Sequence, residues 1–321
     1  MVSAGRSGWM SVLVAAMLPA LPALATELPA WAYPVNPPEY KPAPDDGSIR
    51  RVPGSRAGYT LSQVRDLFSA PDWHPEDHPK MPDIVATGRK PDVFACGFCH
   101  RAEGTGGPEN ASLAGLPVDY IIHQMADYKS GARTTAKPER APQKLMMALA
   151  KSITREEVKA AAAYFAALKP KANLRVVEAD TVPQSYVANW FYADRKNGQT
   201  EPLGRRILEM PEELEHFESR DSRATFVAYV PVGSLKRGEE LVEGRTDKAP
   251  ACSGCHGTDL KGDNVFPPLA GRSPTYIVRQ LYELQVGVRA GRSATKMRAS
   301  VKDLDQDDMI AIAAYLASRP N

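Results

Sequence analysis

Two short motifs contain every cysteine of this 321-residue chain. They are CGFCH at residues 96–100 and CSGCH at residues 252–256. On a helical turn, residues i and i+3 share a face and residue i+4 lies beside them. The two sulfurs can therefore bond the two vinyl groups of one haem while the histidine turns toward its iron. C-x-x-C-H is the attachment motif of a c-type haem. The sequence predicts two covalently bound haem c groups, attached through Cys96, Cys99, Cys252 and Cys255.

Three other uses of paired cysteines are weaker interpretations. A thioredoxin-like dithiol is expected in a βαβ setting and would not explain a histidine after both pairs. Zinc sites usually place two C-x-x-C pairs roughly 12 to 20 residues apart, whereas Cys252 follows Cys96 by 156 positions. A disulfide within C-x-x-C closes so small a loop that it would constrain little of the unfolded chain.

The N-terminus has the pattern of a secretory signal. Arg6 precedes an apolar run from Trp9 to Leu21, and Ala23-Leu24-Ala25 comes directly after it. We predict cleavage after Ala25, which makes residues 1–25 a signal peptide. An uncleaved membrane anchor is the alternative, but the run is shorter than the about 20 residues of a spanning helix. Pro19 within the run and Pro22 directly after it also break such a helix. No later stretch is apolar enough to span, so we expect a periplasmic protein with no membrane span in the mature chain.

Composition excludes some partners and leaves others open. The chain is 43% hydrophobic and 24% charged, with a formal net charge of +2 before the haem propionates are counted. It lacks the clustered basic stripe of a nucleic-acid-binding protein. We therefore expect no nucleic acid and expect redox partner proteins that recognise local surface patches.

An internal repeat extends well beyond the two haem motifs. Residues 113–133 (LAGLPVDYIIHQMADYKSGAR) align without a gap with residues 269–289 (LAGRSPTYIVRQLYELQVGVR), at the same offset of 156. Further on, Tyr164 aligns with Tyr315 at an offset of 151, so the second copy is five residues shorter in between.

The shorter offset selects the methionines that could be sixth iron ligands. At this offset Met146 coincides with Met297, whereas Met147, Met125 and Met81 have no methionine at their repeat positions. Methionine more often fills a core than binds a metal. Agreement between the copies nevertheless favours Met146 and Met297, with Met147 as the alternative in the first copy.

The last helix of each copy has a clear start. Thr154-Arg-Glu-Glu157 is a capping box and Asp305-Gln-Asp-Asp308 is its acidic equivalent. In the second copy the partner of that helix is predicted to be SLKRGEELVEG from Ser234, where Gly238 would let the two backbones cross closely.

Taken together, these residues resemble the cytochrome c4 group of di-haem class I cytochromes c. A haem motif, L-A-G, Y-x-x-x-Q, G-x-R, a methionine and a terminal helix ending near A-Y each occur twice, within residues 96–170 and 234–320. The resemblance implies a mainly α fold with two class I cytochrome c domains in tandem. It also implies His/Met-ligated haems that pass single electrons. The implied axial ligands are His100, Met146, His256 and Met297.

In that group a proline carbonyl before L-x-G accepts the N–H of the proximal histidine, which fixes its tautomer. Pro267 occupies this place in the second copy, and Ala111 in the first.

Two segments depart from the group. Residues 26–90 are a Pro-rich extension in which TLSQVRDLF, from Thr60, is predicted to be helical and to supply the first helix of domain one. His74 and His78 with Asp77 and Asp83 are a candidate metal site, although such surface side chains are more often simply solvated.

The second departure is residues 171–233, a predicted mixed α/β inter-domain segment. LRVVEAD and ATFVAYVPV have strand-like content, and PEELEHFESR is predicted to be a helix with Pro211 at its first position. We expect this segment to pack between the haem domains, and a docking surface for a redox partner is the alternative. The predicted organisation is 1–25 signal peptide, 26–90 extension, 91–170 first cytochrome c domain, 171–233 inter-domain segment and 234–321 second domain.

The predicted function is electron transfer without catalysis. His and Met together saturate a haem iron and leave no position for substrate. One alternative is the electron-accepting cytochrome subunit of a periplasmic dehydrogenase. Another is an enzyme, either a di-haem peroxidase, whose two haem sites would differ from one another, or a thiosulfate-oxidising enzyme, which would need a cysteine on iron. The chain has no spare cysteine.

Overall fold

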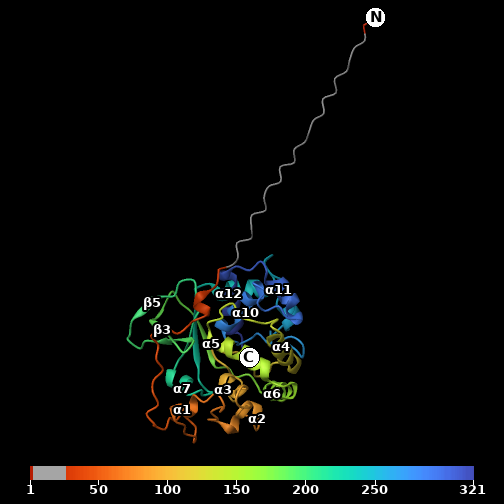
Figure 1. Ribbon diagram of the computed structural model, residues 1–321. Helices are drawn as coiled ribbons and strands as arrows, with labels where there is room; N and C mark the ends of the chain where they lie inside the picture. The colour runs from red at the N-terminus through yellow and green to blue at the C-terminus, as the bar shows by residue number, and fades with distance from the viewer. Residues whose placement is uncertain (3–26) are drawn as a thin grey trace.

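The computed structural model describes residues 1–2 and 27–321, so nearly all of the predicted signal peptide lies outside the described residues. Two helical domains lie one above the other in Figure 1, and a β-rich segment flanks them on one side. The prediction of two helical domains in tandem is confirmed. Among the residues described, no helix is long and apolar enough to cross a membrane.

The first helical domain holds the first haem motif and the predicted capping box. The Thr154 hydroxyl accepts a hydrogen bond from the Glu157 N–H, and the Glu157 carboxylate accepts one from the Thr154 N–H, so the box is confirmed. The domain core includes Ile84, Val85 and Phe165. Its helices are α2 (Asp83–Ala86), α3 (Cys96–His100), α4 (Val118–Ser130), α5 (Ala141–Ser152) and α6 (Arg155–Ala167).

The second helical domain repeats this plan with a longer first helix. Asp305 caps α12 through the Asp308 N–H, as predicted. Helix α8 packs against α12, and a Cβ added at Gly238 would overlap the carbonyl oxygen of Ala311. Gly238 therefore sets the close crossing of the two helices. The helical elements are α8 (Ser234–Val242), α9 (Ser253–His256), α10 (Pro274–Gln285), η3 (Arg292–Ala294), α11 (Thr295–Val301) and α12 (Gln306–Ser318).

In the first domain, prolines shorten the helix that corresponds to α8. Pro82 stands at the repeat position of Gly238, and helix α2 begins only after it. Val85 and Leu241, which also correspond, are both fully buried. The extension takes the place of the helical turns that precede α2 in the repeat. Its residue His78 packs edge-on against Tyr164 of α6, with ring centroids 6.3 Å apart.

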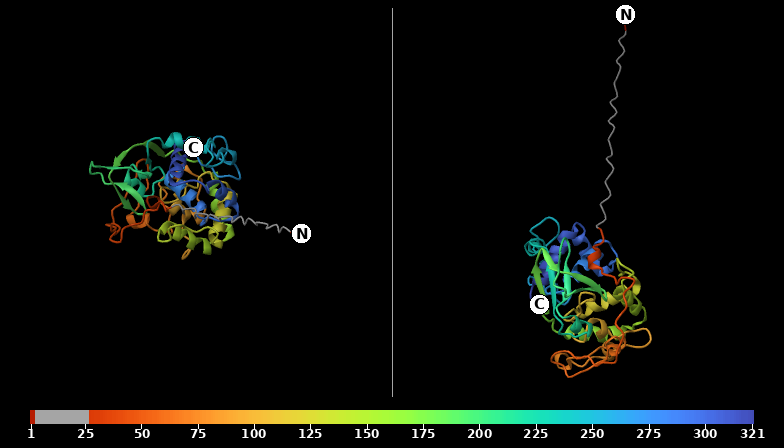
Figure 2. Two further views of the ribbon diagram at one scale, coloured as in Figure 1. Left: turned by 90° about the horizontal axis from the view of Figure 1, so that it is seen from above. Right: turned by 90° about the vertical axis from the view of Figure 1, so that its left-hand side faces the viewer.

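The segment 171–233 forms a small β layer (Figure 2). Strand β7 pairs in parallel with β1 and antiparallel with β6. The strands predicted in LRVVEAD and ATFVAYVPV are present, but the helix of PEELEHFESR begins at Leu214, because Pro211 ends β6 and pairs with Phe226. The elements are β1 (Leu174–Glu178), β2 (Thr181–Pro183), β3 (Ser185–Ala188), β4 (Phe191–Asp194), β5 (Thr200–Pro202), β6 (Leu208–Pro211), α7 (Leu214–Glu218) and β7 (Phe226–Val230).

The N-terminal extension contains only short helices. The helix predicted in TLSQVRDLF is one turn, and its Val64 packs with Val52 and Trp73 in a small separate cluster. It does not join the core of the first domain, so that part of the prediction is wrong. The helical elements are η1 (Ala30–Ala32), α1 (Leu61–Val64) and η2 (Pro75–Asp77).

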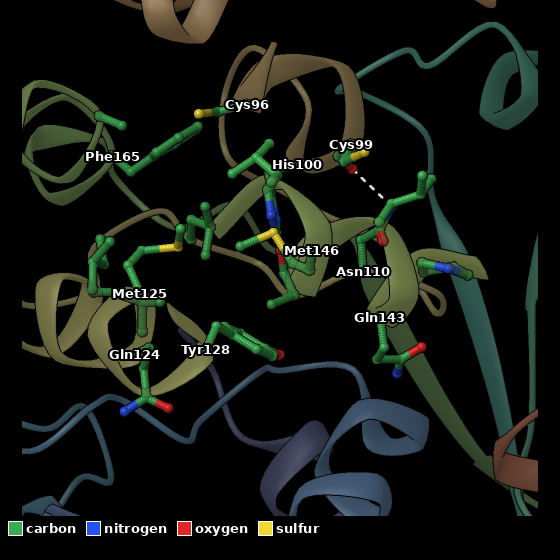
Figure 3. Close-up of a pocket in the computed structure, with 18 of the residues that line it drawn as sticks. Cys96, Cys99, His100, Asn110, Gln124, Met125, Tyr128, Gln143, Met146 and Phe165 are labelled. Carbon is green, nitrogen blue, oxygen red and sulfur yellow. Dashed lines mark hydrogen bonds between the residues drawn. The ribbon is translucent and has the colours of Figure 1, made fainter. Parts of the chain in front are cut away.

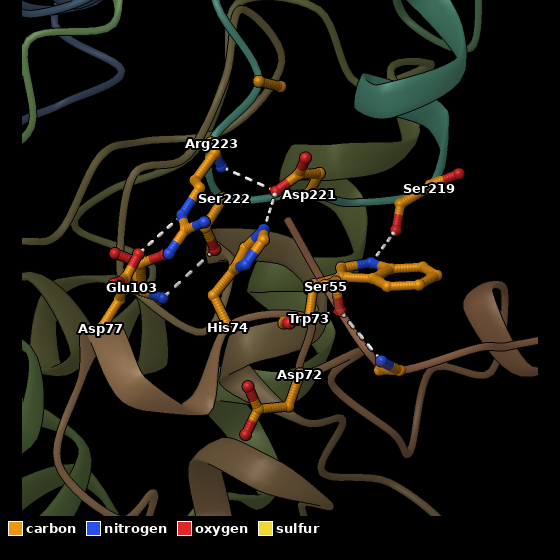
Figure 4. Close-up of polar contacts among 12 residues, drawn as sticks. Ser55, Asp72, Trp73, His74, Asp77, Glu103, Ser219, Asp221, Ser222 and Arg223 are labelled. Carbon is orange, nitrogen blue, oxygen red and sulfur yellow. Dashed lines mark hydrogen bonds and ion pairs between the residues drawn. The ribbon is translucent and has the colours of Figure 1, made fainter. Parts of the chain in front are cut away.

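Polar contacts fasten the extension to the segment 171–233 (Figure 4). The Trp73 indole N–H donates to the Ser219 carbonyl at 2.7 Å, and His74 Nε2 lies 3.0 Å from an Asp221 carboxylate oxygen. The Asp77 carboxylate accepts from Arg223 at 2.8 Å. Of the candidate metal ligands, His74, His78 and Asp77 are thus engaged in other contacts. No group of three or more His, Cys, Asp and Glu side chains that could hold a metal occurs within residues 27–321.

We predict that Gly238→Ala destabilises the holoprotein by about 1–3 kcal/mol. Alanine is favoured over glycine in a helix by about 1 kcal/mol, but the overlap with Ala311 forces α8 away from α12 and outweighs that gain. Chemical denaturation measures the difference, with the exposed Lys236→Ala of the same helix as control. A stability equal to or above that of the wild type would contradict the close crossing.

We also predict that His78 makes stability depend on pH. Its Nε2 lies 3.2 Å from an Asp72 oxygen and its Nδ1 donates to the Pro79 carbonyl at 2.9 Å, so both nitrogens face acceptors. The bond to Asp72 raises the pKa of His78. Because the folded-state pKa is the higher one, the stabilisation is complete below about pH 6.5 and is lost as pH rises through the folded-state pKa. The stability difference between wild type and Asp72→Asn should therefore shrink from pH 5.5 to 8.5, and a constant difference would contradict this.

Candidate haem sites

The first haem motif lines a cavity in the first domain (Figure 3). Helix α3 presents Cys96, Cys99 and His100 to it, and side chains from α4, α5 and α6 form a large part of the other walls. Most of these walls are apolar, as a haem ring requires. The apolar lining includes Ile121, Met125, Leu145, Met146, Leu149, Val158 and Phe165.

Each motif histidine is held by one backbone hydrogen bond. His100 Nδ1 lies 2.8 Å from the Ala111 carbonyl, and His256 Nδ1 lies 2.8 Å from the Pro267 carbonyl. A carbonyl only accepts, so Nδ1 carries the proton and Nε2 keeps a lone pair. Nε2 of His256 is buried without a partner among the described residues. Burial also lowers the pKa of both imidazoles, which keeps them neutral and able to bind iron.

Two matched glycines let the chain return to those histidines. Gly106 and Gly262 have positive φ angles and donate their N–H groups to the carbonyls of His100 and His256. A Cβ at Gly106 would lie 2.6 Å from the carbonyl carbon of Ala111. One at Gly262 would lie 2.7 Å from the carbonyl carbon of Pro267. These glycines were not among the predicted site residues, although their equal spacing from the haem motif in the two copies is visible in the sequence.

The cysteines do not have the character of a catalytic dithiol. No disulfide joins any two of the four cysteines. Burial raises the pKa of Cys96 to about 12 and that of Cys252 to about 11, whereas redox-active pairs have lowered values. This argues against the thioredoxin interpretation, and neutral thiols suit addition to the haem vinyl groups.

The structure distinguishes among the candidate methionines of the first domain. Met146 lines the cavity from α5 and Met125 lines it from α4, whereas Met147 is not among the lining residues. Leu281 stands at the repeat position of Met125, so only Met146 has a methionine counterpart. That counterpart, Met297 on α11, is partly buried against the core of the second domain.

The two domains meet in a nearly symmetric set of hydrogen bonds. Arg133 donates to the Gln124 and Gln280 side-chain carbonyls, both at 2.7 Å. Arg289 donates to the same two oxygens, at 3.0 and 3.2 Å respectively. The repeat alignment found these residues but could not indicate that each arginine reaches across to the other copy.

This interface also closes one end of the first cavity. Tyr276, Gln280 and Glu283 of α10 belong to the second domain, yet they line the cavity that faces His100. The first haem site is therefore directly adjacent to the second domain, which suits electron exchange between the two sites.

We predict that losing both interface arginines costs more than the sum of the single losses. In Arg133→Met or Arg289→Met alone, the remaining arginine still satisfies both amides and is freed from a like charge. In the double variant both amide oxygens lose their donors, and a buried unsatisfied group costs about 1–3 kcal/mol. A double-mutant cycle on unfolding free energy measures the coupling, and additive losses would contradict shared acceptors.

Two helical domains, each with a cysteine-anchoring turn and an oriented imidazole, form the framework of a protein that holds two covalently attached haems. The family model described as Cytochrome c matches residues 86–169 and 235–320, more than half of the chain. The chain belongs to the cytochrome c family. Residues 171–233 lie outside both matched ranges.

Individual relatives show which members of the family this chain resembles. Cytochrome c4 of Azotobacter vinelandii is 32% identical over 138 residues, which cover 39% of this chain and 66% of that protein. The thiosulfate dehydrogenase electron acceptor of Thiomonas intermedia is 26% identical over 236 residues, 72% of this chain and 81% of that protein. The solved thiosulfate dehydrogenase TsdBA of Marichromatium purpuratum is 25% identical with a TM-score of 0.50, over 81% of this chain and 40% of that one. The predicted similarity to cytochrome c4 and the presence of two haem c groups are confirmed.

Proposed function

We propose that this protein is a periplasmic electron carrier whose two haem irons are each held between a histidine and a methionine. The observation that carries the proposal is the doubled proximal geometry, in which each imidazole is fixed by a hydrogen bond from Nδ1 to a backbone carbonyl and directs Nε2 away from that carbonyl. The proposed axial pairs are His100 with Met146 and His256 with Met297.

The chain's own residues would prepare each site for electron transfer. When bound, haem c supplies a reversible one-electron couple. The carbonyls of Ala111 and Pro267 hold the imidazole rings in one orientation, and the apolar walls exclude water. A thioether as sixth ligand raises the reduction potential and leaves no open iron position, which supports transfer without substrate chemistry. The signal-like N-terminus and the covalent attachment support a periplasmic location.

A second candidate role is a more specific version of the first. The Thiomonas relative is named as an electron acceptor of thiosulfate dehydrogenase, which supports a dehydrogenase as the electron donor of this chain. Oxidation of a sulfur compound by this chain itself is a weaker candidate. Such an enzyme would need a cysteine on iron, and all four cysteines belong to the haem motifs.

Replacing the proposed distal ligands should lower one potential at a time. Met146→His and Met297→His should each lower the potential of the altered site by a sizeable part of the about 0.8 V range that axial ligands control, as measured by redox titration. Met125→Leu and Met147→Leu are matched controls that should leave both potentials and the near-infrared sulfur-to-iron band unchanged. An unchanged titration in Met146→His, or loss of the band in Met125→Leu, would refute the assignment.

Haem content and ligand exclusion test the function itself. The pyridine haemochrome assay should give two haem c per chain, and the reduced protein should resist carbon monoxide because both irons are saturated. Rapid carbon monoxide binding at one haem would instead favour a peroxidase-type enzyme.

A further inference from the structure

The two haem motifs differ in how far their surroundings leave them open. Cys99 is partly buried, whereas Cys255 at the matching position is exposed. Phe98 of the first motif is 5% exposed, whereas Gly254 at the matching position of the second motif is exposed. The second cysteine of each motif thus faces protein in the first domain and solvent in the second.

The cover over the first motif comes from the two segments outside the family-matched ranges. The Arg220 guanidinium lies 3.6 Å from the centre of the Phe98 ring and donates to the Phe98 carbonyl at 3.1 Å. Arg140 of the first domain is fully buried and donates to the Trp190 carbonyl at 2.8 Å. Beside Cys99 lies a second pocket whose walls include Pro42, Leu61, Trp190, Phe217 and Arg220.

The second domain presents different residues at the corresponding positions. Glu109, which is 8% exposed, corresponds to Val265, which is 69% exposed. At the shorter offset, Ala141 and Leu145 of the first domain correspond to Arg292 and Lys296, which are both exposed. Cys99, Glu109, Ala141 and Leu145 line one pocket of the first domain. We therefore expect their counterparts Cys255, Val265, Arg292 and Lys296, which include one apolar residue and two cations, to lie on one face of the second domain.

These two cations have no acidic partner among residues 1–2 and 27–321. Neither Arg292 nor Lys296 forms an ion pair with any residue in the part of the chain that the structure describes. The Asp263 carboxylate accepts from the N–H groups of Val265 and Phe266 and forms no ion pair with either cation among the described residues. Cations without ion-pair partners beside an exposed apolar side chain favour a partner protein whose contact surface has acidic groups around an apolar patch.

We propose that a redox protein with an acidic contact surface docks on the second domain at the face formed by Cys255, Val265, Arg292 and Lys296, and not on the covered first domain. This proposal rests on the proposed electron-carrier function. It assigns the extension and the segment 171–233 a role in closing the first haem edge to protein partners, so that partners exchange electrons at the second haem.

A titration with an acidic redox protein tests this. The isotope-labelled, reduced holoprotein is titrated with the soluble domain of cytochrome b5, and backbone amide shifts are followed by NMR at low ionic strength. We expect the shifts to centre on residues 254–266 and 292–298. Shifts centred on Trp190, Phe217 or the first haem motif, or no binding at all, would overturn the proposal.

Matched charge reversals separate local docking from overall charge. Arg292→Glu with Lys296→Glu should raise the Kd at least tenfold and reduce its salt dependence. Lys151→Glu with Lys159→Glu changes the net charge equally on exposed helical positions of the first domain, and should change the Kd less than about twofold because distant charges are screened. Equal weakening by both pairs would refute a local face.

Failure of the docking proposal can be distinguished from failure of the proposed function. Haem content and the reversible titration of both haems are measured on the same variants. Two intact one-electron couples with binding elsewhere would reject only the docking face, whereas a missing couple would reject the electron carrier.

Discussion

The hydrogen bond from each motif histidine to a carbonyl eleven residues later is the constraint on which both domains depend. It places the proton on Nδ1 and leaves Nε2 for the iron. The return of the chain requires a glycine with positive φ, at Gly106 and again at Gly262, because a Cβ would collide with the accepting residue. The haem-motif turn and the loop that returns to its histidine therefore depend on each other, and both occur together in each copy.

Features fixed by near neighbours, or present in both copies, could be predicted from the sequence. Each capping box is defined by four consecutive residues. The close crossing at Gly238 requires only a helix in which one residue has no side chain. Where distant partners decide, local patterns fail. The predicted helix in TLSQVRDLF ends after one turn, and the Leu67 carbonyl accepts from Ala95 across the chain. No local pattern in the sequence indicates that Trp73 will bond to Ser219, which is 146 positions away.

The same distinction explains why the motif histidines were easier to identify in the sequence than the contacts between the domains. The repeat alignment is a comparison of one copy with the other, so it shows what each copy has in common. Arg133 and Arg289 were visible as equivalent residues, but their shared use of Gln124 and Gln280 depends on a two-fold arrangement of the domains that the alignment does not contain.

The backbone after the first haem motif carries the sharpest difference between the copies. Arg101 has φ 68° and ψ 157°, a conformation that is otherwise taken by glycine and costs of order 1–3 kcal/mol. Its counterpart Gly257 has nearly the same angles without that cost. The Arg101 guanidinium is buried, lies over the Phe217 ring at 4.7 Å and approaches the Phe217 carbonyl.

The strained arginine is thus held in place by the segment that packs over the first haem motif, and it helps to hold that segment. Arg140 acts in the same way through Trp190, and its counterpart in the second domain is also a glycine, Gly291. Where the second domain has glycines, no side chain is available to anchor a cover. The exchange of glycine for arginine at two repeat positions therefore accounts for why one domain is closed by inserted chain while its structural copy remains open.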